Sequence, residues 1–179
     1  MFNTGKLVIL AMGLMAVAGV AISFWYHQQN SKQILAYLGP ETASLVARAD
    51  GVELLVLDVV DLPANDLPAE KNAILPIDGE PHAIVARYDL SQTPGLIHAR
   101  TALLEDANYD WQTSDASCAP AWTYALKFTH QDQSTTLLIS LDCPRLRVSG
   151  REQSVTLGRL AEALDSFFAE QQSSEPGRR

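Results

Sequence analysis

The chain has very few cysteines, only Cys118 and Cys143 among 179 residues. They form no Cys-x-x-Cys pair, so the close spacing that lowers a thiol pKa for redox catalysis is absent. A structural zinc site needs short pairs of ligands, and the sequence offers none. The four histidines also stand singly, as surface or capping residues, at His27, His82, His98 and His130. We therefore expect no metal and no cofactor.

Other catalytic signatures are lacking too. There is no Gly-x-Ser-x-Gly elbow and no glycine-rich phosphate loop followed by lysine. Ser140, His98 and Asp142 can be combined on paper into a Ser-His-Asp set, as similar residues can in most sequences. Two sets of acidic residues are candidates for calcium binding, but neither matches the pattern of a twelve-residue calcium loop. They are Asp58 with Asp61, and Glu105 with Asp106 and Asp110. We expect a binding protein rather than an enzyme.

Basic residues are scarce, with 13 lysines and arginines against 21 acidic residues and a net charge of −8. All the acidic residues lie from Glu41 onward, and only Lys6 and Lys32 of the basic ones precede it. A negative surface repels phosphate backbones, so nucleic acid is not an expected partner. Apolar residues make up 47% of the chain, which is typical of globular proteins and not of disordered ones.

Charge is absent from Leu7 to Tyr26, a run of twenty residues. At 1.5 Å per residue a helix of this length measures about 30 Å, which is enough to cross a hydrocarbon core. Aromatic side chains prefer the headgroup region, and three of them end the run: Phe24, Trp25 and Tyr26. The sequence predicts a signal-anchor over residues 1–26 that contacts the lipid bilayer through residues 7–26.

A cleaved signal peptide is the competing interpretation. Lys6 would be its charged region, and cleavage would follow Ala18 in "AVA". The apolar run continues to Trp25, where a mature chain should turn polar, and this favours an uncleaved anchor. Cleavage would instead release a secreted soluble module.

The flanks of the run predict its orientation. Lys6 precedes the span without any acid, which favours a cytoplasmic N-terminus. No cysteine follows the run, so no lipoprotein attachment site is present. We expect a single-pass protein of the cell inner membrane with its C-terminal domain outside the cytoplasm. The predicted parts are a linker over 27–39, the exported domain over 40–170 and a flexible tail over 171–179.

The remaining chain predicts an α+β domain, with a small antiparallel sheet and helices packed on one face. Helical patterns cover 40–50, 94–107 and 154–172, and strand patterns cover 52–60, 82–90 and 145–150. A loop with four of the nine prolines spans 61–81 and holds a short edge strand near Ile74–Ile77. The second helix offers four candidate core contacts: Leu96, Ile97, Leu103 and Leu104.

Cys118 and Cys143 bracket a hairpin whose apolar residues alternate, beginning with Trp122 and Tyr124. Pairing Phe128 with Gln133 would set the cysteines directly opposite, whereas pairing Thr129 with Ser134 would leave them diagonal and require the strand ends to bend. We interpret the pair as a disulfide that closes the hairpin, and two buried thiols are the alternative.

Trp111 lies beside a polar segment and is the candidate for an exposed contact with a partner protein of the membrane or envelope. The expected function is that of an anchored binding or envelope-assembly module. The alternative is an anchored, hydrolase-like envelope enzyme whose site residues are distant in sequence.

Overall fold

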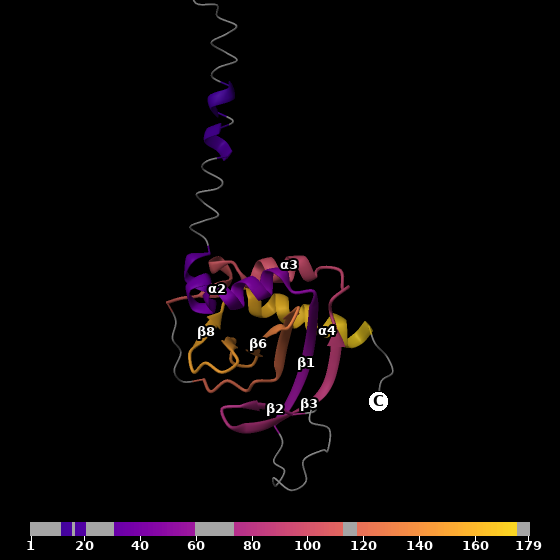
Figure 1. Ribbon diagram of the computed structural model, residues 1–179. Helices are drawn as coiled ribbons and strands as arrows, with labels where there is room; N and C mark the ends of the chain where they lie inside the picture. The colour runs from indigo at the N-terminus through magenta and orange to yellow at the C-terminus, as the bar shows by residue number, and fades with distance from the viewer. Residues whose placement is uncertain (1–11, 16, 21–30, 60–73, 113–117, 175–179) are drawn as a thin grey trace, which may run out of the picture.

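Eight antiparallel strands form one sheet in the order β2-β3-β1-β5-β6-β7-β8-β4 in the computed structural model (Figure 1). The structure describes residues 12–15, 17–20, 31–59, 74–112 and 118–174. The strands are β1 (Gly51–Val59), β2 (Ile74–Ile77), β3 (Glu80–Asp89), β4 (Tyr109–Asp110), β5 (Tyr124–His130), β6 (Gln133–Ser140), β7 (Arg145–Val148) and β8 (Ser154–Leu157). The helices are α2 (Lys32–Arg48), α3 (Leu96–Leu103), η1 (Asp106–Asn108) and α4 (Leu160–Ser174). The predicted α+β class and antiparallel sheet are confirmed.

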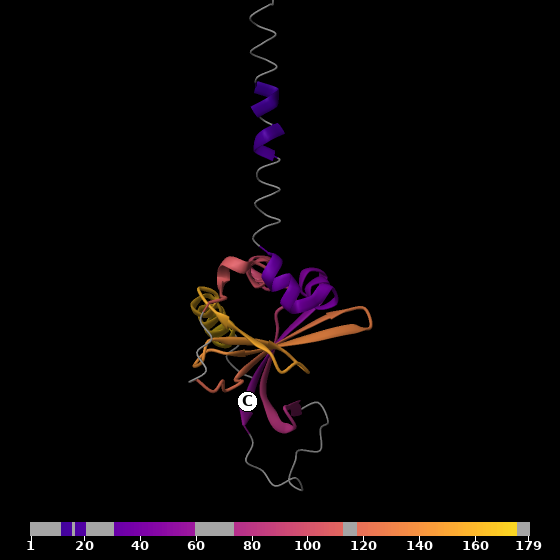
Figure 2. The same ribbon diagram turned by 90° about the vertical axis from the view of Figure 1, so that its left-hand side faces the viewer.

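The helices cover one face of the sheet, as predicted (Figures 1 and 2). Within the described residues, the larger core contains side chains from α2, α3 and α4 and from six strands. The period-2 pattern of the hairpin explains this, because Leu126 and Phe128 of β5 point to this core while Ala125 points to the other face.

The opposite face carries a smaller core to which none of the described helices contributes a side chain. The β2–β3 hairpin and the segment before β5 supply part of it. Its buried members are Leu55, Leu57, Ile77, Trp122, Ala125 and Leu138. Trp122 therefore lies on the face opposite to Tyr124, which packs against the larger core. The prediction that the two share a face is wrong, because the chain is not in strand conformation before Tyr124.

Two further predictions are corrected. Residues 154–157 form strand β8 rather than the start of the last helix, since Val155 and Thr156 are β-branched and favour a pleated strand. Gly158 then ends the strand, and a Cβ atom there would lie 3.1 Å from the Asn108 carbonyl oxygen. In the second helix Ile97 is 75% exposed and is no core residue, although Leu96 and Leu103 are buried.

Helix α2 begins at Lys32, before the predicted start of the domain, and is kinked at Gly39–Pro40. Gly39 has φ 75°, a backbone conformation that glycine adopts without steric cost. Ile34 and Leu38, which precede the kink, are 0% and 1% exposed in the larger core. The chain therefore contributes to the domain core from residue 34 onward.

Residues 12–15 and 17–20 of the apolar run are helical. Their large apolar side chains are 64–71% exposed: Met12, Leu14, Met15, Val17 and Val20. Over the described parts of the chain, no helix combines the length and the apolar character that a membrane crossing needs. Phe24, Trp25 and Tyr26 lie outside the described residues.

Candidate functional site

The start of α2 is capped by a carboxylate from a distant part of the sequence. Asp106 of η1 accepts hydrogen bonds from the backbone N–H groups of Gln33, at 3.0 Å, and Ile34, at 2.7 Å. These are among the N–H groups that a helix start leaves without an internal partner. Ser31, the residue in the capping position, makes no side-chain hydrogen bond of this kind. Asp106 thus fixes the first turn of α2 to the domain and complements the positive end of the helix.

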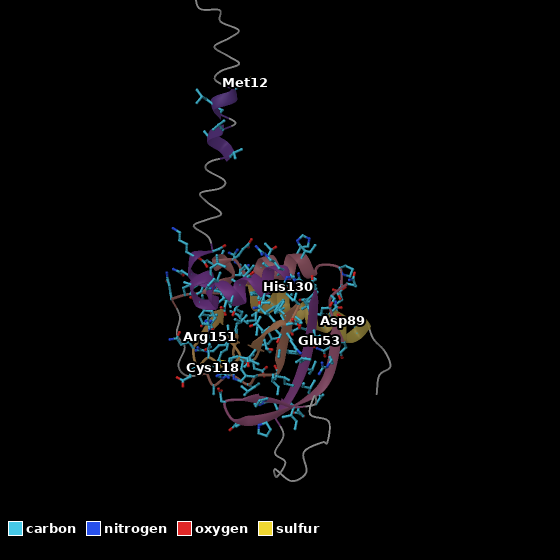
Figure 3. All side chains as sticks on the ribbon, in the orientation of Figure 1. Met12, Glu53, Asp89, Cys118, His130 and Arg151 are labelled. Carbon is cyan, nitrogen blue, oxygen red and sulfur yellow. A yellow bond between two sulfur atoms is a disulfide. The ribbon has the colours of Figure 1, made fainter. Side chains whose placement is uncertain are left out.

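The other end of the first half of α2, at Tyr37 and Leu38, is also hydrogen-bonded to a distant residue. Arg151 is labelled in Figure 3. Its guanidinium donates hydrogen bonds to the carbonyl oxygens of Tyr37 and Leu38, the latter at 2.9 Å, just before the kink. The Tyr37 hydroxyl lies 2.8 Å from the Gln153 carbonyl oxygen, and burial raises its pKa. Residues 32–38 are therefore hydrogen-bonded to the rest of the domain at both ends.

Trp111 extends from the same region. Its indole N–H donates to the backbone oxygen of Asp106 at 2.9 Å, and its ring centroid lies 5.6 Å from that of Tyr109. Tyr109 is buried, donates its hydroxyl to the Leu103 carbonyl oxygen at 2.8 Å and has a pKa raised by burial. Trp111 itself is 36% exposed. The ring is thus oriented by its neighbours while part of it faces outward.

We use the name entry face for three exposed apolar side chains: Leu35 of α2, Ile97 of α3, and Trp111, which is hydrogen-bonded to the Asp106 that caps the start of α2. Leu35 is in the first turns of α2 and is 41% exposed, and Ile97 is in the first turn of α3. In both views α2 and α3 lie together at the end of the domain where α2 begins, and the β2–β3 turn lies at the other end (Figures 1 and 2). Among residues 31–59, 74–112 and 118–174, the other exposed large apolar side chain is Val85 of β3.

The two cysteines are brought together. Their Cα atoms lie 5.9 Å apart and the sulfur atoms are at disulfide-bonding distance. The hairpin uses the diagonal register, with Thr129 opposite Ser134, and Cys143 lies in the turn after β6. The chain departs from strand geometry at both strand ends, which is the bending that the diagonal register requires.

On the face opposite the helices, Arg147 of β7 is buried beside Trp122. Its guanidinium carbon lies 4.6 Å from the ring centroid, within the range of a cation–π contact, and it forms a 2.7 Å ion pair with Asp78. Its Nε atom is buried and has no hydrogen-bond partner within the described ranges. A hollow of about 250 Å³ opens here, lined in part by Ile77, Leu138 and Arg147. The sequence pattern had not indicated this arrangement, because its residues come from four separate segments.

A second hollow, of about 280 Å³, lies between α2 and the β5–β6 turn. His130 and Ser44 line it, and the Nδ1 atom of His130 lies 2.7 Å from a carboxylate oxygen of Asp50. A carboxylate in this position orients an imidazole in hydrolases of the Ser-His-Asp type. No hydrogen bond joins Ser44 to His130 in the described part of the chain.

The Ser-His-Asp set drawn from sequence does not assemble. Ser140 is buried on the face opposite the helices and accepts a hydrogen bond from the Cys143 N–H group, whereas His98 is exposed on α3. His82 is buried rather than on the surface, and its ring lies 3.2 Å from the Glu80 carbonyl oxygen. Within the described ranges no three histidine, cysteine or carboxylate side chains are grouped to hold a metal ion.

No family model, curated protein or solved structure matches this chain. What the protein does must therefore be inferred from its own residues.

Proposed function

We propose that the protein is a single-pass inner-membrane protein whose α+β domain lies outside the cytoplasm and binds a membrane or envelope protein as an assembly module. Residues 7–26 form the anchor, and Phe24, Trp25 and Tyr26 lie at its outer interface. The observation that carries the proposal is the run of twenty uncharged residues placed shortly before a helix that is locked into the domain.

The exposure of the described part of this run supports the anchor. Met15 and Val20 are 70% and 71% exposed, so the domain does not bury them. Apolar side chains in this number are stabilised by removal from water, and the bilayer provides that environment for a helix of this length.

The cysteine pair supports an exported domain. Cys118 and Cys143 lie at disulfide-bonding distance, and disulfides form and persist in oxidising compartments such as the periplasm. The short sequence between the apolar run and α2 supports an assembly role, because α2 is hydrogen-bonded to the domain and the domain would therefore stay close to the membrane.

A photo-crosslinking scan tests the binding role. A crosslinking residue replaces Val85 on β3, Glu152 at the rim of the Arg147 hollow, or Asp165 on the outer side of α4. We expect one of these positions to form a discrete adduct with a single envelope protein in intact cells while another stays unmodified. The absence of adducts at all three positions, with normal membrane levels, would contradict an assembly module.

An anchored hydrolase is the second candidate, and the His130–Asp50 pair beside Ser44 is the observation that favours it. Labelling of the membrane-bound protein with a fluorophosphonate tests this candidate directly. Labelling that is lost in both Ser44→Ala and His130→Gln would replace the binding role with an enzymatic one. The same labelling in Ser140→Ala serves as the control, because that serine lies outside this hollow.

A further inference from the structure

We propose that the entry face rests on the surface of the lipid bilayer, with Trp111 at the level of the headgroups and Leu35 and Ile97 beside it. This inference rests on the proposed anchor and extends it, because it assigns an occupant to a surface of the domain. The contact partner is lipid, not a second protein.

The length of chain between the apolar run and the domain is the first argument. Five residue steps separate Tyr26, the last residue of the run, from Ser31 at the start of α2. A fully extended chain advances at most ~3.6 Å per residue, so this segment reaches at most about 18 Å. The N-terminus of α2 must then lie close to the outer membrane interface.

The lock on α2 is the second argument. A short tether alone would let the domain turn, but Asp106 and Arg151 bind the first half of α2 to η1 and to the segment after β7. The end of the domain that carries α2 and α3 is therefore the one held toward the membrane, and the β2–β3 turn is held away from it (Figures 1 and 2).

The chemistry of the exposed side chains is the third argument. Single exposed apolar residues are normal on soluble domains. Here Leu35 and Ile97 belong to α2 and α3, the helices at the end that the short tether holds near the bilayer (Figures 1 and 2). Trp111 is hydrogen-bonded to Asp106, which caps the start of α2. Tryptophan prefers the membrane–water interface because its ring is apolar and its N–H needs a hydrogen-bond partner. In Trp111 the N–H already has that partner in the Asp106 carbonyl oxygen, and the exposed part of the ring can contact lipid.

Tryptophan fluorescence of the full chain in phosphatidylcholine vesicles tests the anchor and the lipid contact of the entry face separately, because the chain has three tryptophans in three different settings. Trp25 reports on the anchor, Trp111 reports on the entry face, and Trp122 is 7% exposed and provides a constant background. The variants Trp25→Phe and Trp111→Phe each leave one reporter, and the double variant gives the background. Quenchers are lipids brominated near the headgroup and aqueous iodide.

With Trp25→Phe, we expect brominated lipid to quench Trp111 above the background of the double variant and iodide to have little effect. Quenching of Trp111 by iodide but not by lipid would overturn the inference, and quenching of Trp25 by lipid in the same experiment would show that the anchor nevertheless stands. Protection of Trp111 from both quenchers would mean that a second copy covers it, and this too would overturn the lipid assignment. Lipid quenching of Trp111 without that of Trp25 would support the surface contact and contradict the anchor.

A matched pair of variants tests the neighbouring side chain. Ile97→Gln on the entry face should reduce lipid quenching of Trp111, because a polar side chain weakens the insertion of the surface into the interface. Val85→Gln makes the same chemical change on β3 and should leave the quenching unchanged. Equal quenching in both variants would overturn the assignment of Ile97 to the contact.

Discussion

The carboxylate of Asp106 accepts a hydrogen bond from the backbone N–H of Ile34 at 2.7 Å, across a sequence separation of 72 residues. This contact joins the first turn of α2 to the 3₁₀ turn whose Asp106 also accepts a hydrogen bond from Trp111. A residue that is distant in the sequence thus fixes the first turn of α2 to the domain.

Removal of the Asp106 cap should destabilise the first turn of α2. Asp106→Ala leaves two backbone N–H groups without their partner, and we expect a loss of about 1–2 kcal/mol in the free energy of unfolding. Urea denaturation measures the loss. Asp165→Asn on the outer side of α4 also removes a negative charge and should change the stability by less than about 0.5 kcal/mol. Similar losses in the two variants would show that Asp106 does not act through the cap.

The cysteine pair should stabilise the domain. Closing a loop with a sequence separation of 25 residues contributes roughly 3–4 kcal/mol in the chain-entropy model. The Cys118→Ser, Cys143→Ser double variant should therefore unfold at a lower urea concentration than the oxidised protein. It should unfold at nearly the same concentration as the reduced wild type. Coincident unfolding curves for the oxidised and reduced protein would contradict a structural disulfide.

Buried tyrosines should make the domain sensitive to alkaline pH. Burial raises the pKa of Tyr109 and of Tyr37 above the ordinary value of 10.0, so the folded state retains protons that the unfolded state releases. This contribution to stability is fully present below pH 10.0 and is lost as the pH rises further. Denaturation measured from neutral to strongly alkaline pH should show a smaller fall in stability for Tyr109→Phe than for wild type. Tyr88→Phe is the control, and an unchanged fall in Tyr109→Phe would contradict the assignment.

The buried guanidinium of Arg147 should contribute more by its volume than by its charge. Arg147→Met keeps a long side chain against Trp122 and should change stability by less than about 1 kcal/mol, because desolvation offsets much of the ion pair. Arg147→Ala leaves a void beside the indole ring and should cost about 2 kcal/mol or more. Thermal unfolding followed by tryptophan fluorescence compares them. A Met variant as unstable as the Ala variant would show that the charge dominates.

The fold class could be predicted from the sequence because alternation and helical spacing are local signals. Leu126 and Phe128 alternate with polar residues, and the hairpin follows directly. The predicted ends of helices and strands were less accurate where two patterns overlap. Val155 and Leu157 fit a helical spacing with Leu160, yet β-branched side chains and Gly158 favour a strand over residues 154–157.

The features around the candidate sites could not be predicted, because each joins residues that are distant in sequence. The Asp106 cap has no signature near Gln33, and the contact of Arg147 with Trp122 depends on the chain leaving strand geometry before Tyr124. The cysteine pairing was predictable because both residues flank one hairpin, although two registers fitted the sequence and only the contacts of β6 select one.

The intact mass of the protein tests the proposed anchor most directly. The expressed chain is recovered from the membrane fraction and from the medium, and each sample is treated with a thiol-alkylating reagent before and after reduction. We expect the full 179-residue chain in the membrane fraction alone, with two alkyl groups added only after reduction. A shortened chain in the medium that begins after Ala18, with both thiols alkylated without reduction, would contradict the anchor and the disulfide together.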